Sequence, residues 1–254
     1  LPGKTQWSPK EFLFPRSEAM FGYELRGNDV VLADPPSPNV EQVFFGVRPC
    51  DAAGLMRLDA VLGADPVYAK RRGLTAIVAY ACEQADAECF CTAVRGSPAG
   101  QEGADILLVP NSDGVLARCL TPMGESLWAT APAPKTATTA DWDQAVAKVR
   151  ELESQMKRTN VAQGMLSALQ ANFESPAWAE QSRRCVGCSI CTYVCPSCSC
   201  FEVKDECNSS CGTRCRNWDS CTFGLFTRHA SGHNPRPTQA SRYRQRVLHK
   251  FVYF

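Results

Sequence analysis

The sequence lacks several features that would point directly to a function. Its 254 residues contain no run of 18 or more apolar residues, which argues against a membrane span. Net charge is only +1 and charged residues make up 21%, so overall charge indicates no particular partner. The sequence shows no recognisable Ser/His/Asp or paired-carboxylate pattern of the kind that forms catalytic sites. The Gly-containing stretch 96–100 has no strand–GxGxxG–helix context, so it does not indicate a nucleotide site.

The two ends of the chain also lack expected features. No charged-then-apolar secretory leader is visible. The chain begins at Leu1 rather than at Met, and it ends on the aromatic sequence FVYF without a polar tail. We therefore expect it to be a fragment.

Histidine is scarce and acid is absent from the C-terminal region. The three histidines, His229, His233 and His249, are expected to be surface or hydrogen-bonded groups rather than ligands. The last 33 residues hold no acid but six basic residues. Basic segments of this kind occur in nucleic-acid binding proteins. They can also place positive charge beside an anionic metal cluster, or form a docking surface for a partner subunit. We favour these local roles for Arg228, Arg236, Arg242, Arg244, Arg246 and Lys250.

Cysteine, in contrast, is abundant. The chain has 15 cysteines, an odd number, and ten of them lie between Cys185 and Cys221. Disulfide-stapled scaffolds are usually short, secreted and richer in cysteine by fraction. Clustering of this kind indicates metal ligation in a reducing cytosol, so we expect a cytoplasmic protein.

The strongest motif is CVGCSICTYVCP at 185–196, a C-x2-C-x2-C-x3-C-P run. Structural zinc sites usually show two Cys pairs separated by a longer loop, so three Cys at consecutive short gaps favour iron–sulfur over zinc. In two-cluster ferredoxins the first three Cys of such a run bind one [4Fe–4S] cluster and the fourth binds another. Cys185, Cys188, Cys191 and Cys195 therefore imply a partner run, which is not obvious in this chain.

A second set of cysteines lies in the N-terminal half. Cys50 follows the apolar run 42–47, and Cys82 ends the apolar run 74–81. Parallel neighbouring strands would bring both thiols to one sheet edge, where α/β sheets place ligands. Cys89 and Cys91 would return to the same place on the adjoining loop. The four could complete a cluster, although buried, unligated thiols are equally compatible with the spacing.

Six further cysteines follow the main run. Cys198 and Cys200 come directly after Pro196, and Cys221 closes the series. Cys207, Cys211 and Cys215 repeat every four residues, but the residues between them are poor helix formers. These thiols are possible extra ligands, either in an additional site or as substitute ligands for the other clusters, or they are unligated.

The apolar pattern predicts an α/β N-terminal domain, a helical connector and a ferredoxin-like Fe–S domain poor in regular structure. Strands are expected at 42–47, 74–81, 105–110 and 114–120, and Asp51 is expected to cap a helix ending near residue 62. Helical periodicity begins at Asp141, and Ser175-Pro176 predicts the N-cap and first residue of a short helix. The expected domains are 1–130, 131–183 and 184–254.

Several stretches together resemble one protein family. They are EFLFPRSE, FFGVRPCDAAGLMRLD, YAKRRG, YACEQADAECFC, CVGCSICTYVCPSCSCF and RNWDSCTFGLFTRHASGHNPRP. They resemble the iron–sulfur β subunit of cytoplasmic sulfhydrogenase-type hydrogenases, a family that includes the corresponding iron–sulfur component of anaerobic sulfite reductase. The resemblance covers nearly the whole chain from about residue 9 onward. Family members usually begin earlier and continue past Phe254 with a second ferredoxin run, so the resemblance implies that both segments are missing here.

The resemblance implies an electron-transfer subunit of an oxidoreductase complex in anaerobic metabolism. Such subunits relay electrons between a flavin subunit linked to NAD(P)H or ferredoxin and a catalytic subunit of hydrogenase or sulfite reductase type. It implies one N-terminal [4Fe–4S] cluster and one or two C-terminal ones. Cys185, Cys188, Cys191 and Cys195 match the first ferredoxin run, and Cys50, Cys82, Cys89 and Cys91 match the N-terminal set. Cys198, Cys200 and Cys221 also fall on family positions, and Cys221 is the in-chain candidate to complete the cluster on Cys185, Cys188 and Cys191.

Two alternatives stay open. The extra thiols could form a site that reduces a sulfur compound, or zinc could stabilise an interaction module. The main interpretation assigns no substrate chemistry to this chain, no nucleic acid and no membrane span.

Overall fold

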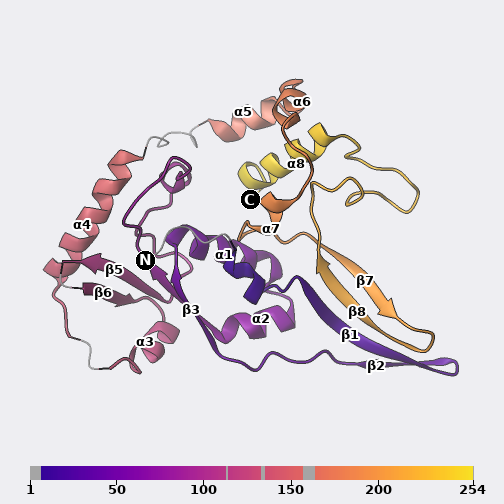
Figure 1. Cartoon of the computed structure of the whole chain (residues 1–254), viewed down its shortest axis with the longest axis horizontal. Helices are drawn as coiled ribbons and strands as arrows, with labels where there is room; N and C mark the ends of the chain where they lie inside the picture. Colours follow the sequence, from indigo (N-terminus) through magenta and orange to yellow (C-terminus); the bar gives the residue numbers. More distant parts are fainter. Residues whose placement is uncertain (1–6, 113, 133–134, 157–163, 254) are drawn as a thin grey trace. The chain divides into compact units, whose positions relative to one another are not determined.

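The structure is a computed structural model, and it describes residues 7–112, 114–132, 135–156 and 164–253. Contacts divide the chain into two compact units, one from 1–13 and 38–162 and the other from 14–37 and 163–254. Each unit has its own four-stranded sheet (Figure 1). The three domains expected from the sequence stay a prediction, because contact density groups residues without showing which parts fold alone.

The first sheet has the strand order β3-β4-β5-β6. Its strands are β3 (Gln42–Val47), β4 (Thr75–Tyr80), β5 (Ile106–Asn111) and β6 (Gly114–Cys119). β4 pairs in parallel with both β3 and β5, while β6 pairs antiparallel with β5. The short apolar runs thus form strands where they were expected, and the parallel pairing of β3 and β4 meets the condition for bringing Cys50 and Cys82 together.

Helices α1 (Pro49–Leu62) and α2 (Pro66–Gly73) connect β3 to β4. The expected cap of the first helix was wrong. Arg48 is the N-cap residue and Pro49 starts the helix, because proline is favoured where the first N–H has no partner. Asp51 lies instead in the first turn, where its charge interacts favourably with the helix dipole. Asp65 caps α2, accepting from the backbone N–H groups of residues 67 and 68.

The core of this unit lies on both faces of the sheet. On one face Val78, Ile106 and Leu108 form a cluster with side chains of α3 (Pro122–Trp128). Residues of opposite orientation on the same strands, Ile77 and Leu107, are fully buried. Two-sided burial is typical of parallel strands and explains their continuous apolar sequences. Helix α1 contributes the buried side chains of Leu55, Leu58 and Leu62.

Helix α4 (Thr139–Gln155) begins two residues before the predicted start, because Thr138 caps it. Its buried residues recur every three to four positions, as a helix with one apolar face requires. They are Trp142, Ala145, Val149 and Leu152. The short 3₁₀ helices are Pro9–Phe12 and Cys91–Val94.

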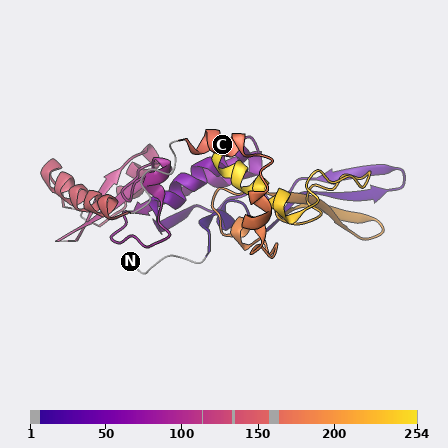
Figure 2. The same ribbon diagram turned by 90° about the horizontal axis from the view of Figure 1, so that it is seen from above.

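The second unit contains the antiparallel sheet β2-β1-β8-β7. Its strands are β1 (Ser17–Arg26), β2 (Asp29–Ala33), β7 (Phe201–Cys207) and β8 (Cys211–Trp218). The C-terminal region therefore has more regular structure than expected. Figure 2 shows the two hairpins of this sheet extending away from the helices of the same unit.

The helices of the second unit are α5 (Met165–Ala171), α6 (Ala177–Ser182), α7 (Ile190–Tyr193) and α8 (Gln239–Phe251). Helix α6 starts one residue later than predicted. Pro176 is its N-cap residue, and the Ser175 hydroxyl accepts from the Ala177 N–H at 3.3 Å. Helix α8 packs against α5 and α6. Among the residues that the structure describes, no helix is both long enough and apolar enough to span a bilayer.

Candidate metal centres

The structure brings the predicted N-terminal thiols together. Cys50 lies in the first turn of α1, just after β3, and Cys82 follows β4. The Cys50 thiol is an electrostatic neighbour of Cys82 and Cys91. Cys82 in turn neighbours both Cys91 and Cys89. The four residues therefore gather at the carboxyl edge of the parallel strands, as the spacing predicted.

The loop that carries Cys89 and Cys91 is held by its own backbone. The Cys82 N–H donates to the carbonyl of Pro98 at 2.9 Å, and the Gly96 N–H donates to the carbonyl of Cys91 at 2.8 Å. Asp86 accepts from the Cys89 N–H at 3.1 Å, and its carboxylate lies 3.2 Å from the Cys89 sulfur. Several independent hydrogen bonds thus return the loop to the edge where Cys50 and Cys82 lie.

Cys50 is exposed to solvent, and the other three thiols of this group are half-buried. Protein atoms packed around the Cys50 thiol raise its pKa, with further contributions from Asp51 and Cys82, while Arg48 acts in the opposite direction. Burial also raises the pKa of Cys82 and of Cys91. Such thiols stay protonated unless a positive centre compensates for the lost hydration. Iron is such a centre, so four neighbouring sulfurs with little other cationic charge fit an iron–sulfur cluster.

In the second unit, a network of buried hydroxyls shapes the ferredoxin-type run. The Ser189 hydroxyl lies 2.8 Å from that of Thr222, and the Thr192 hydroxyl lies 2.9 Å from that of Ser220. All four side chains are at most 3% exposed. Ser189 has φ 63°, so the run turns sharply between Cys188 and Cys191. The network ties this turn to both chain neighbours of Cys221.

Four thiols after Cys191 lie close to one another. Cys195 and Cys198 are hydrogen-bond partners, Cys221 is hydrogen-bonded to Cys200, and Cys221 also neighbours Cys198. The hydrogen bond from Cys198, together with the Lys250 ammonium, lowers the pKa of Cys195 to about 4. The same hydrogen bond raises the pKa of Cys198. This group was not predicted as a unit, because its members belong to three separate sequence motifs.

Cys207, Cys211 and Cys215 lie on the β7–β8 hairpin. Cys207 and Cys211 are exposed, whereas Cys215 is buried and pairs across the sheet with Ala19 and Lys204. A hydrogen bond between Cys207 and Tyr23 raises the pKa of that tyrosine. The strand periodicity of two places Cys207 and Cys211 on opposite faces, because Cys207 pairs with Gly212.

Across the described ranges, no three His, Cys, Asp or Glu side chains are arranged to hold a single metal ion. In each unit the grouped cysteine sulfurs lie near one another, but among the described residues they are not arranged around one point as the ligands of a single metal ion would be. Each thiolate of a [4Fe–4S] cluster binds a different iron, so its ligands do not converge on one atom.

The basic C-terminal residues divide between local roles. Arg246 donates to the Cys198 sulfur at 3.5 Å, and Lys250 donates to the Ser197 hydroxyl at 2.9 Å. Arg244 does not contact the cysteines in these ways; it donates to the Phe173 carbonyl and to the Glu174 carboxylate. Gln239 donates to the Cys185 sulfur at 3.0 Å. Gln239 was not identified as a site residue from the sequence. The one feature that could have suggested it is its position seven residues, or about two helical turns, before Arg246 in the same helix.

Comparison with known proteins gives one match to the C-terminal region and one match to nearly the whole chain. Residues 184–254 match the family described as a 4Fe-4S dicluster domain. Sulfhydrogenase 2 subunit beta of Pyrococcus furiosus is 32% identical over 256 residues, which cover 97% of this chain and 73% of that protein. The chain belongs to the sulfhydrogenase beta subunit family. No solved structure matches it.

The predicted resemblance to sulfhydrogenase beta subunits is thus confirmed. So are the predictions of [4Fe–4S] clusters and of an electron-transfer subunit, while the number of clusters stays a prediction. The assignment of individual cysteines to clusters also stays a prediction.

Proposed function

We propose that this sulfhydrogenase-type beta subunit relays electrons between a flavin-containing subunit, linked to NAD(P)H or ferredoxin, and a catalytic subunit of hydrogenase or sulfite reductase type. The observation that carries the proposal is the separate gathering of thiols in each unit of the chain. The [4Fe–4S] clusters would supply one-electron redox chemistry when bound. The chain would hold them, bury them and set their surroundings.

In the first unit, Cys50, Cys82, Cys89 and Cys91 are the proposed ligands of one cluster. Two features support this set: the parallel pairing of β3 with β4 and the mutual proximity of the thiols. Cys50 comes from the first turn of α1, Cys82 from the segment after β4, and the other two from the adjoining hydrogen-bonded loop.

In the second unit, Cys185, Cys188 and Cys191 are the proposed ligands of another cluster. Cys221 was the in-chain candidate for the fourth ligand, but its sulfur is hydrogen-bonded to Cys200 and neighbours Cys198. We therefore assign Cys221, together with Cys195, Cys198 and Cys200, to a further centre. This division accounts for the one or two C-terminal clusters proposed for the chain.

The experiment is to compare the iron content of Cys50→Ser with that of Cys119→Ser, both purified anaerobically. Cys119 is a suitable control because its sulfur contacts the Gly124 carbonyl at 3.7 Å and it packs in the apolar cluster of the first unit. We expect Cys50→Ser to lose about four irons, one cubane cluster. We expect Cys119→Ser to keep the iron content of the parent protein.

Equal iron in Cys50→Ser and the parent would remove the N-terminal cluster from the proposal. Stoichiometric zinc in the parent, with neither iron nor acid-labile sulfide, would contradict the electron-relay function itself and establish a zinc-stabilised module instead.

A further inference from the structure

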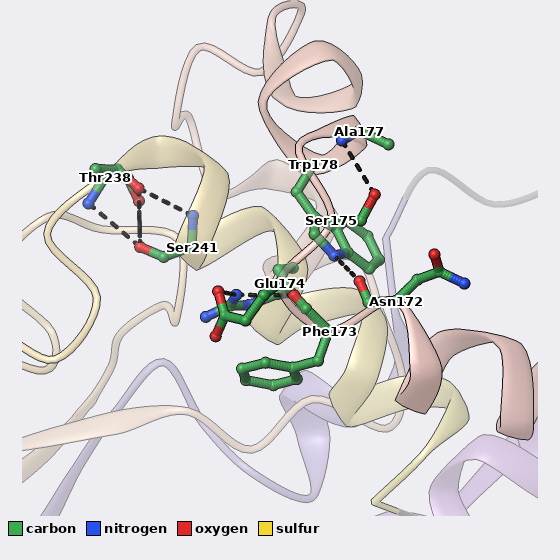
Figure 3. A network of polar contacts seen from close by, with 9 residues as sticks. Asn172, Phe173, Glu174, Ser175, Ala177, Trp178, Thr238 and Ser241 are labelled. Atoms are coloured by element: carbon green, nitrogen blue, oxygen red, sulfur yellow. Dashed lines mark hydrogen bonds and ion pairs between the residues drawn. The ribbon is translucent and has the colours of Figure 1, made fainter.

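Helix α8 is fixed in place by contacts on one side. Thr238 and Ser241 form a reciprocal cap at its start, each backbone N–H donating to the other side chain at 3.2 Å (Figure 3). Arg244 donates to the Phe173 carbonyl and to the Glu174 carboxylate, both at 2.9 Å. Its guanidinium also stacks 3.9 Å from the centre of the Phe173 ring. A capped and anchored helix presents its remaining side chains in defined directions.

A different stripe of α8 contacts the cysteine run. Gln239 and Arg246 are seven residues apart, which is about two helical turns, and Lys250 is four residues further. The Gln239 amide nitrogen lies 3.0 Å from the Cys185 sulfur. Arg246 donates both to the Cys198 sulfur, at 3.5 Å, and to the Cys191 carbonyl.

The orientation of the Gln239 amide is set by its own partner. Arg242 donates to the Gln239 amide oxygen at 2.9 Å, and a guanidinium can only donate. The amide NH₂ is thereby directed at the Cys185 sulfur. Arg242 is in turn held by the carbonyls of Arg236 and Pro237, at 3.1 and 3.0 Å.

Lys250 extends the same stripe by one more turn. Its ammonium donates to the Ser197 hydroxyl at 2.9 Å, and this hydroxyl lies 3.4 Å from the Cys195 sulfur. An amide donor and two cations from a single helix therefore adjoin the sulfurs of Cys185, Cys198 and Cys195, directly or through Ser197.

We propose that this stripe of α8 raises the reduction potentials of the clusters held by the 185–200 region, Gln239 acting at Cys185 and Arg246 with Lys250 acting at Cys198 and Cys195. Reduction adds one electron, and hence one negative charge, to the cluster and its thiolates. N–H···S hydrogen bonds and nearby cations stabilise the more negative state. Gln239 and Arg246 thus act as positioning residues that favour electron acceptance. The inference rests on the proposed function, since it requires a cluster at this run.

The test measures midpoint potentials by EPR-monitored titration of the whole chain. Arg246→Gln removes the cation, and Gln239→Leu removes the amide donor without changing charge. The control is Arg26→Gln on β1, which removes the same charge from an exposed residue paired with Glu24. For Arg246→Gln we expect a downward shift equal to about a tenfold fall in the ratio of reduced to oxidised cluster at the parent midpoint, or about 59 mV for one electron. Gln239→Leu should shift in the same direction, and Arg26→Gln should not shift.

Iron content and the potential together separate the possible outcomes. A parent protein without iron contradicts the proposed function, and the inference with it. Full iron in Arg246→Gln together with the parent potential overturns only the inference about α8. If Arg246→Gln loses its iron, the midpoint potential of Gln239→Leu provides the test instead. A potential equal to that of the parent protein overturns the inference, and a lower potential supports it. Arg246→Lys, which keeps the charge, should recover most of the shift.

Discussion

Arg216 illustrates at the residue scale how the second unit is stabilised. Its side chain is 5% exposed and pairs with Glu18, which is 9% exposed. The guanidinium also lies 5.1 Å from the Phe14 ring centre and 5.6 Å from that of Phe201. A buried pair of this kind is costly to break, because the remaining charge is left without compensation.

We therefore expect Glu18→Gln to lower the free energy of unfolding by about 3–5 kcal/mol. The matched control is Glu24→Gln on the same strand. Glu24 pairs with Arg26 at the surface, so its loss should cost about 0–1 kcal/mol. Anaerobic urea unfolding followed by circular dichroism measures both. Equal losses in the two variants would show that burial of the Arg216 pair does not stabilise the sheet.

The site could be predicted from the sequence only where a residue type is itself diagnostic. Closely spaced cysteines identify a metal-binding run because thiolates are soft ligands with few other reasons to cluster. Gln239 could not be identified in this way, because glutamine is common on helix surfaces. Ser189 and Thr222 were likewise missed, since their hydroxyl contact joins two segments 33 residues apart.

At the scale of elements, caps define where helices begin. The Thr138 hydroxyl accepts from the Asp141 N–H at 3.2 Å, and Asp141 accepts from the Thr138 N–H at 2.8 Å. This capping box satisfies donors that the first turn of α4 leaves unpaired. It places Trp142 on the buried face of the helix.

We expect Thr138→Ala to destabilise the first unit by about 1 kcal/mol. Thr136→Ala is the control, because Thr136 lies in the same exposed segment outside the helix. Thermal unfolding of both variants under the same anaerobic conditions provides the comparison. A loss of stability in Thr136→Ala as large as in Thr138→Ala would mean that the segment, and not the cap, is responsible.

Elements were predictable where local pattern and burial agree. β4 and β5 have continuous apolar sequences because both of their faces are buried. The β7–β8 hairpin was missed because β7 is exposed along its whole length and β8 contains few of the apolar and β-branched residues that mark a strand. Its pairing is supported instead by cross-strand contacts such as Arg214 with Asp205, at 2.8 and 2.7 Å.

At the scale of the whole molecule, chain order and spatial grouping differ. Residues 14–37 belong to the unit formed by the C-terminal segment, since β1 pairs with β8 from Ser17 with Asn217 to Glu24 with Cys211. Strand pairings of such long sequence separation leave no local signal. This explains why no strand was predicted before residue 42, although the β1–β2 hairpin turns at Gly27, with φ 64°.

The central claim is that each unit of this chain holds an iron–sulfur cluster. Iron and acid-labile sulfide, quantified on the anaerobically purified chain together with EPR spin integration after reduction, test it most directly. We expect at least about eight irons and an equal amount of sulfide per chain, with signals from at least two clusters. About four irons or fewer, or zinc in place of iron and sulfide, would contradict the claim.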